Sequence, residues 1–192
     1  MASQPVSVFS RHVTLFSALT AVKPNSSEAP VSILWTNICI AFFPLLSGFK
    51  IAGKEPVLQD DTEPDCVVFQ IVMTNPNLRT PRRSADLAER QIFIVECKRP
   101  SKDTPAEWES AKDQLLHYCE GNVNGTTRVF GATAIGTKVK FWRFDYPRLT
   151  PLSAGGETYD LLDPRGSNQA EQCLNYIRNN GWNWVQSGTL LP

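Results

Sequence analysis

The sequence contains few of the side chains on which many catalytic and metal sites depend. Its two histidines, His12 and His117, are too few for a histidine-based metal site. Its five cysteines include no Cys-x-x-Cys pair, so we expect neither a zinc site nor a disulfide framework. It has no glycine-rich phosphate loop and no motif that orders a Ser-His-Asp or Cys-His set. Unpaired cysteines favour a reducing, intracellular compartment, cytoplasmic or nuclear.

The sequence also lacks a net charge, because 19 basic residues balance 19 acidic residues. This argues against a dedicated nucleic-acid coat protein, which is normally strongly basic. A nuclease is not excluded, because its cleft needs positive charge only locally. Basic residues cluster in two neighbouring stretches: Arg79, Arg82, Arg83 and Arg90, then Lys98, Arg99 and Lys102. These stretches are either nucleic-acid contacts or solvated loops.

No segment has the full pattern of a signal peptide or of a membrane span. The first twelve residues lack a basic region followed by an apolar run, so we expect no signal peptide. Residues 29–49 carry no charge and are nearly long enough to cross a bilayer. Asn37 and Pro44 interrupt that run, however, and no cluster of Lys or Arg flanks it. We therefore expect a buried helix of a soluble domain, with a membrane-associated protein as the alternative.

The length of 192 residues fits one domain with a substantial core. Residues 1–30 have weak periodicity, which predicts a weakly structured extension or a short helix over residues 8–21. Residues 31–186 are expected to form the single domain, and residues 187–192 a C-terminal tail.

Apolar runs and turn residues predict the elements of this domain. Strands are expected over residues 49–58, 65–72, 91–98, 128–135, 138–144 and 159–162, and a final helix over residues 167–179 that Gly181 closes. The polar segment 74–90 reads as a loop or insertion. Gly136-Thr137 suits a type II′ hairpin. The pattern indicates an α/β or α+β fold.

One further helix has a legible start and end. Thr104 offers an N-cap hydroxyl, Pro105 the first helical position and Glu107 a capping-box carboxylate. Gly121 is a natural C-terminal stop. Within the helix, Gln114 and Tyr118 are four residues apart and lie on one face. An amide and a phenol directed from that face toward a sheet need polar neighbours.

The strand over residues 91–98 carries charges that an apolar strand rarely has. Alternation places Ile92, Ile94, Glu96 and Lys98 on one face. A carboxylate and an ammonium group there are costly to bury without a partner or a purpose. Asp65 begins the other strongly apolar strand. Two adjacent strands can bring Asp65 and Glu96 within reach of one hard cation such as Mg²⁺, which takes one or two carboxylates.

Taken in order, Pro64-Asp65, Glu96-Cys97-Lys98 and the helical pair Gln114 and Tyr118 resemble the PD-(D/E)XK nuclease superfamily. They are most similar to its exonuclease-type branch, which has a Gln-x-x-x-Tyr motif. The flanking residues 93–100 and 131–142 also resemble uncharacterised fungal members of that group. The resemblance covers roughly residues 50–145.

The resemblance implies a restriction-endonuclease-like fold, a central mixed sheet flanked by helices. It implies hydrolysis of DNA or RNA phosphodiester bonds with Mg²⁺ or Mn²⁺ as cofactor. Asp65, Glu96 and the Cys97 carbonyl would hold the metal, which activates water and stabilises charge on the phosphate. Lys98 would orient the water or neutralise the developing oxyanion. Gln114 would position Lys98 or the nucleic acid, and Tyr118 would support the helix or the strand.

Two further expectations accompany the resemblance. Arg79, Arg82, Arg83 and Arg99 are the candidate nucleic-acid contacts. The family usually has an acid on its first core helix, whereas residues 29–49 supply none, and Glu28 and Glu55 are the nearest acids. The alternative function is a nuclease-fold module that has lost catalysis and binds nucleic acid or protein.

Overall fold

A mixed sheet of seven strands forms the centre of the computed structural model, which describes residues 6–53, 63–125 and 127–190. The strands are β1 (Phe49–Ala52), β2 (Cys66–Met73), β3 (Leu87–Lys98), β4 (Arg128–Ile135), β5 (Lys138–Asp145), β6 (Arg148–Pro151) and β7 (Tyr159–Asp160). They lie in the order β1-β2-β3-β4-β5-β6, and β7 pairs with β5. The β3–β4 pair is parallel and all the other pairs are antiparallel.

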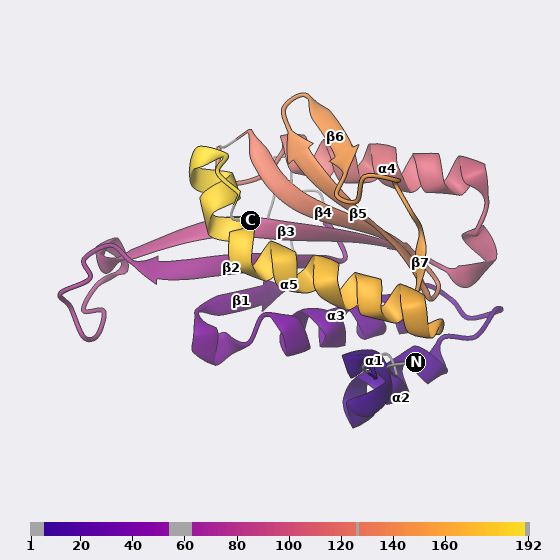
Figure 1. The fold of residues 1–192 in the computed structure, drawn as a ribbon. Coiled ribbons are helices and arrows are strands. Elements are labelled where there is room, and N and C mark those ends of the chain that lie inside the picture. Colours follow the sequence, from indigo (N-terminus) through magenta and orange to yellow (C-terminus); the bar gives the residue numbers. More distant parts are fainter. Residues whose placement is uncertain (1–5, 54–62, 126, 191–192) are drawn as a thin grey trace.

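Helices cover both faces of this sheet (Figure 1). The helices are α1 (Val8–Arg11), α2 (Val13–Ala21), α3 (Ala29–Phe42), α4 (Pro105–Glu120) and α5 (Pro164–Ser187). Helix α4 packs on one face through a small apolar cluster, and α3 and α5 pack on the other through the main aromatic core. The prediction of an α/β or α+β fold with a mixed sheet flanked by helices is confirmed.

Helix α4 connects the parallel strands β3 and β4, as parallel pairing requires. It begins where the sequence predicts, because the Thr104 hydroxyl accepts a hydrogen bond from the Glu107 N–H at 3.4 Å. The Glu107 carboxylate pairs with Lys102, which lies in the short turn before the helix. The cap therefore fixes the geometry of the chain directly after the end of β3.

The N-terminal segment is helical, so the expectation of a weakly structured extension is wrong for the described residues. Phe9, Leu15 and Leu19 are buried in the main core, which gives α1 and α2 a surface to pack against. Glu171 of α5 accepts a hydrogen bond from the backbone N–H of Val8 at 2.9 Å. The alternative prediction, a helix over residues 8–21, matches the two short helices.

The uncharged segment at residues 29–49 contains the helix α3, which ends before Pro44. Its buried side chains, including Leu34, Trp35 and Ile38, face the sheet. The prediction of a helix buried in the domain is confirmed. Among the described residues, no helix combines the length and the apolarity that a membrane span needs.

Several elements differ from the sequence predictions: β6 is not among the predicted strands, β7 ends at Asp160, and α5 begins at Pro164. Two further boundaries differ as follows. Strand β3 begins at Leu87, so the predicted loop at 74–90 ends four residues earlier and its last part pairs with β2. Helix α5 continues through Gly181 and ends at Ser187, and the following Gly188 forms a left-handed cap with a φ of 71°. Gly181 is instead a contact position, because a Cβ there would lie 2.8 Å from Cδ1 of Ile92.

Candidate active site

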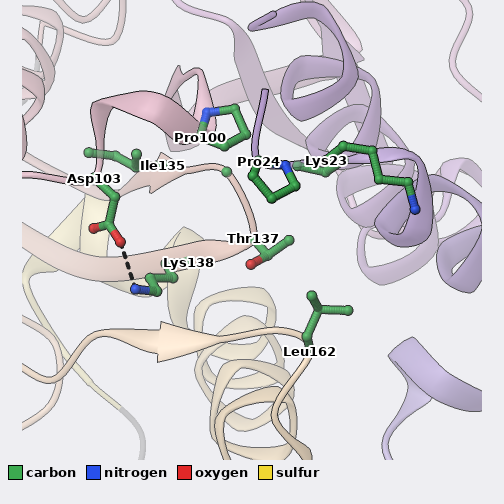
Figure 2. Close-up of a pocket in the computed structure, with 10 residues that line it drawn as sticks. Lys23, Pro24, Pro100, Asp103, Ile135, Thr137, Lys138 and Leu162 are labelled. Atoms are coloured by element: carbon green, nitrogen blue, oxygen red, sulfur yellow. Dashed lines mark hydrogen bonds and ion pairs between the residues drawn. The ribbon is translucent and has the colours of Figure 1, made fainter. Parts of the chain in front are cut away.

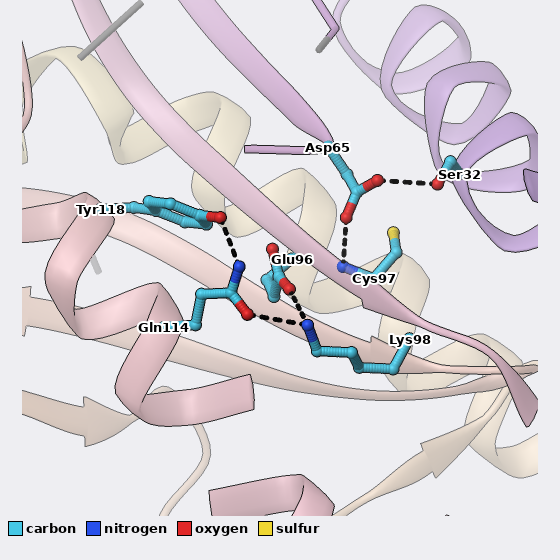
Figure 3. A network of polar contacts seen from close by, with 7 residues as sticks. All are labelled: Ser32, Asp65, Glu96, Cys97, Lys98, Gln114 and Tyr118. Atoms are coloured by element: carbon cyan, nitrogen blue, oxygen red, sulfur yellow. Dashed lines mark hydrogen bonds and ion pairs between the residues drawn. The ribbon is translucent and has the colours of Figure 1, made fainter. Parts of the chain in front are cut away.

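The ends of β2 and β3 meet beside the N-terminus of α3, and most of the predicted site residues gather there (Figure 3). Antiparallel pairing sets Cys66, the first residue of β2, opposite Val95 of β3. Asp65 immediately precedes this pair, and Glu96 and Cys97 immediately follow it. The register therefore places Asp65 beside the two residues with which the sequence had grouped it.

Two hydrogen bonds hold the Asp65 carboxylate, whose residue is 7% exposed. Its Oδ2 accepts from the backbone N–H of Cys97 at 2.8 Å, and its Oδ1 accepts from the Ser32 hydroxyl of α3 at 2.8 Å. Hydrogen bonds to a carboxylate are among the stronger ones in proteins. Asp65 is therefore oriented between α3 and β3 before any ligand binds.

Glu96 and Lys98 point toward α4, on the face that Ile94 shares. Ile92 does not lie on this face, contrary to the predicted alternation. The β2–β3 register shifts between Val68 and Phe69, which leaves Ile92 without a partner in β2. Such a bulge interrupts the alternation of side chains, and Ile92 packs on the opposite face against Gly181.

A chain of polar contacts runs from Glu96 through Lys98 to α4 (Figure 3). The Lys98 ammonium donates to Oε1 of Glu96 at 2.5 Å and to Oε1 of Gln114 at 2.7 Å. The Gln114 amide then donates to the Tyr118 hydroxyl at 2.6 Å. Helical spacing places Gln114 and Tyr118 on one face, as the sequence predicts. The four side chains thus form one network that fixes the position of the ammonium group.

Burial and neighbouring charge shift the proton affinity of this network. Burial raises the pKa of Glu96 to about 7, against the opposing effect of Lys98, and the charges of Asp65 and Glu28 raise it further. For Lys98, burial opposes the charged form, but the hydrogen bond and the charge of Glu96 outweigh it and raise the pKa. Glu96 therefore takes up a proton more readily than an ordinary glutamate, and Lys98 gives up its proton less readily than an ordinary lysine.

Glu28 belongs to the same electrostatic environment. It caps the start of α3, one turn before Ser32, and its charge raises the pKa of both Glu96 and Lys98. The sequence analysis named Glu28 as a nearby acid without assigning it to the site. The four-residue spacing of Glu28 and Ser32 at a helix start is the signal that points to one shared face. Glu55, the other acid considered, lies outside the described residues.

Asp65, Glu96 and the Cys97 carbonyl are oxygen donors of the kind that a hard divalent cation takes. Asp65 and Glu96 supply two buried carboxylates, and their mutual repulsion contributes to the raised pKa of Glu96. The N–H and C=O of one strand residue project to the same side, so the Cys97 carbonyl is directed to the side on which Asp65 lies. Mg²⁺ takes one or two carboxylates and keeps several waters. Across the described ranges, no group of three or more His, Cys, Asp or Glu side chains is arranged to hold a metal.

The predicted nucleic-acid contacts separate into two places. Arg99 directly follows Lys98 and is exposed. Arg79, Arg82 and Arg83 are also exposed, but they lie beyond the opposite end of β3. The eleven residue steps from Leu87 to Lys98 span about 36 Å at roughly 3.3 Å each. The fold therefore does not bring these three arginines to the carboxylates.

A cavity of about 220 Å³ lies next to the end of β3 (Figure 2). Its walls include Pro24 and Pro100, and the β4–β5 hairpin tip closes one side. The N–H of Gly136 in that tip donates to the Lys98 carbonyl at 3.1 Å. Gly136 has a φ of 62°, and a Cβ there would approach Pro100 to 3.0 Å. The hairpin tip thus fixes the backbone that carries Lys98.

Comparisons with protein-family models, with curated proteins and with solved structures gave no match for this chain.

Proposed function

We propose that this chain is a metal-dependent nuclease that hydrolyses phosphodiester bonds of DNA or RNA. The observation that carries the proposal is the proximity of Asp65, Glu96 and Lys98 at the adjoining ends of β2 and β3, near enough for their charges to interact, with the ammonium group held by Gln114. The resemblance of these same residues to the PD-(D/E)XK superfamily supports it. A buried Glu–Lys pair alone would be a weak indication, because structural ion pairs also shift pKa values.

Mg²⁺ or Mn²⁺ would be held by Asp65, Glu96 and the Cys97 carbonyl, and it would supply an activated water and charge stabilisation at the phosphate. Ser32 and the Cys97 N–H keep Asp65 oriented. Glu28 adds negative charge that attracts a cation to this end of α3.

Lys98 provides the fixed positive charge of the site. Its ammonium group has three donors, of which Glu96 and Gln114 take two. The third donor is available in principle to a phosphate oxygen or to the attacking water. A preorganised charge of this kind stabilises developing negative charge without reorganisation. Gln114 and Tyr118 act as positioning residues, since they restrain the ammonium group from the side of α4.

The test is cleavage of end-labelled DNA and RNA, single-stranded and double-stranded, with Mg²⁺, with Mn²⁺ and with EDTA. We expect cleavage with either metal, none with EDTA, and none for Glu96→Gln. Circular dichroism of the variant checks that the fold is retained. A wild-type protein that cuts equally well in EDTA, or a Glu96→Gln variant with full activity, contradicts the proposal.

The second candidate is a nuclease-fold module that binds nucleic acid or protein without cleaving. The observation in its favour is the small donor set, because the described part of the chain has no cluster of three metal-ligating side chains. The same experiment separates the two candidates. Binding of labelled strands without cleavage under any metal condition would favour the module over the nuclease.

A further inference from the structure

The β2–β3 hairpin extends beyond the rest of the sheet as a two-stranded arm (Figure 1). Strand β1 pairs with β2 only as far as Gln70, and β4 pairs with β3 only from Phe93 onward. Residues 71–89, here called the basic arm, therefore pair only with each other among the described strands. The arm lies at the end of β3 opposite to Lys98.

The tip of the basic arm is an ordered structure built around Asp86, which is 8% exposed. Its Oδ2 accepts hydrogen bonds from the N–H groups of Arg82 at 2.9 Å and Arg83 at 3.1 Å. Its Oδ1 accepts from Nε of Arg83 at 3.2 Å. Its backbone carbonyl accepts from the Thr74 N–H at 2.9 Å, which closes the loop onto β2. The hydrogen bonds of Asp86 thus hold the segment that carries the arginines in one conformation.

The tip of the basic arm carries more positive charge than its buried acid, Asp86, neutralises. Arg79, Arg82 and Arg83 are all exposed. Asp86 neutralises Arg83, whereas Arg79 and Arg82 form no ion pair with any acid in the parts of the chain that the structure describes. Arginine is well suited to bind phosphate, because its planar fork of donors matches the phosphate oxygens. The tip therefore presents two uncompensated guanidinium groups to an anionic partner.

The span from the arm arginines to the site is at least as long as one turn of a nucleic-acid duplex, because these arginines lie beyond Leu87. Leu87 to Lys98 covers about 36 Å along β3, and one turn of B-DNA covers about 34–36 Å. A duplex bends little over this length, since its persistence length is about 150 base pairs. A straight rod that touches Lys98 and the tip of the arm must lie along the strand and meet them at least about one turn apart.

We propose that the basic arm binds the phosphate backbone of a duplex at least about one helical turn from the phosphate at Lys98. The inference rests on the proposed nuclease function and specifies its substrate as double-stranded. Arg79 and Arg82 contact phosphates, so they add affinity without reading sequence. Duplexes much shorter than about ten base pairs on that side reach Lys98 without reaching the arm.

The first experiment measures binding of full-length protein to a 24-base-pair DNA duplex in EDTA at several salt concentrations. Each phosphate contact contributes about 0.9 to the slope of log affinity against log salt. The double variant Arg79→Ala/Arg82→Ala should lower the slope by about 1.8 and weaken binding by about 60-fold at 0.1 M salt. Arg148→Ala/Arg165→Ala, which removes two other exposed arginines, is the matched control. Equal slopes for the wild type and the arm variant overturn the inference.

The second experiment measures cleavage with Mg²⁺ for duplexes of 6 to 24 base pairs. The wild type should gain activity as the duplex passes roughly ten base pairs, and the arm variant should lose this gain while cutting the shortest duplexes as the wild type does. A length profile shared by both proteins overturns the inference. If the protein cleaves no substrate but the arm variant still has a lower salt slope than the wild type, the nuclease function is refuted. The same result supports the arm as a surface that binds the phosphate backbone. If cleavage of single strands of the same lengths depends on the arm to the same extent, the spacing that a rigid duplex would set is refuted.

Discussion

Two glutamates of β3 form Glu–Lys pairs that have the same N–O distance and opposite surroundings. Glu89 pairs with Lys50 and Glu96 pairs with Lys98, each at an N–O distance of 2.5 Å. The side chains of the first pair are 41% and 47% exposed, whereas those of the second are 3% and 20% exposed. An exposed pair contributes about 0–1 kcal/mol to stability. A buried pair often gains less from its attraction than it loses by leaving water.

The difference indicates that the two pairs have different purposes. The Glu89–Lys50 pair needs no explanation beyond two opposite charges that meet at the exposed surface across β2. The Glu96–Lys98 pair is surrounded by Asp65, Glu28 and Gln114, and its carboxylate has a pKa raised to about 7. A fold that needed only stability would have little reason to bury a second acid beside Asp65. This comparison is what favours a functional site over a structural ion pair.

The largest expected effect is that of removing the ammonium group of the buried pair, with the exposed pair as the control. Lys98→Ala should lower metal-dependent cleavage by on the order of 10²- to 10³-fold, the usual loss when a preorganised charge is removed from a site. Lys50→Ala should leave the cleavage rate nearly unchanged. Initial rates on a labelled duplex measure both variants. Equal rates for the wild type and Lys98→Ala would show that the buried pair has no catalytic role.

The buried pair should also make stability depend on pH in the absence of metal. The pKa of Glu96 is higher in the fold, at about 7, than its ordinary value of 4.5. The folded state therefore binds the proton more tightly, and this stability is fully present below pH 4.5 and is lost as the pH rises through 7. We expect a loss on the order of 3 kcal/mol relative to Glu96→Gln. Chemical denaturation in EDTA at pH 4.5, 6 and 8 measures it, and parallel profiles for the two proteins contradict the assignment.

The smallest effect should come from the far end of the polar network. Tyr118→Phe removes the hydroxyl that accepts from the Gln114 amide at 2.6 Å. Losing one such hydrogen bond is worth about 1 kcal/mol, so kcat should fall about fivefold while KM stays constant. Tyr159→Phe is the matched control, because Tyr159 is as buried as Tyr118 but lies in the main core. A rise in KM with unchanged kcat would show that Tyr118 acts on substrate binding instead.

The strands that carry the site were predictable from the sequence, because local patterns determine them. The apolar runs beginning at Asp65 and ending at Lys98 form adjacent strands, and the cap at Thr104 starts α4. Spacing along one helix was enough to place Gln114 and Tyr118 on one face. These features depend on neighbours that are close in the chain.

The rest depends on contacts between distant segments, which one sequence does not display. Ser32 reaches Asp65 across 33 residues, and Glu28 acts on Glu96 only because α3 packs beside β3. The bulge at Ile92 and the continuation of α5 through Gly181 accompany each other, because the Ile92 side chain fills the space that a side chain at Gly181 would take. Local rules predicted a regular strand and a helix stop at these two positions, and tertiary packing overrode both.

Direct titration with Mn²⁺ tests the central claim that Asp65 and Glu96 form a cation site. Asp65 and Asp86 offer a matched comparison, because both are nearly buried aspartates that accept backbone N–H groups, one at the site and one in the basic arm. Calorimetry should show one Mn²⁺ bound by the wild type and by Asp86→Asn, and an affinity at least about tenfold weaker for Asp65→Asn. Equal Mn²⁺ affinity in Asp65→Asn and the wild type would contradict the claim.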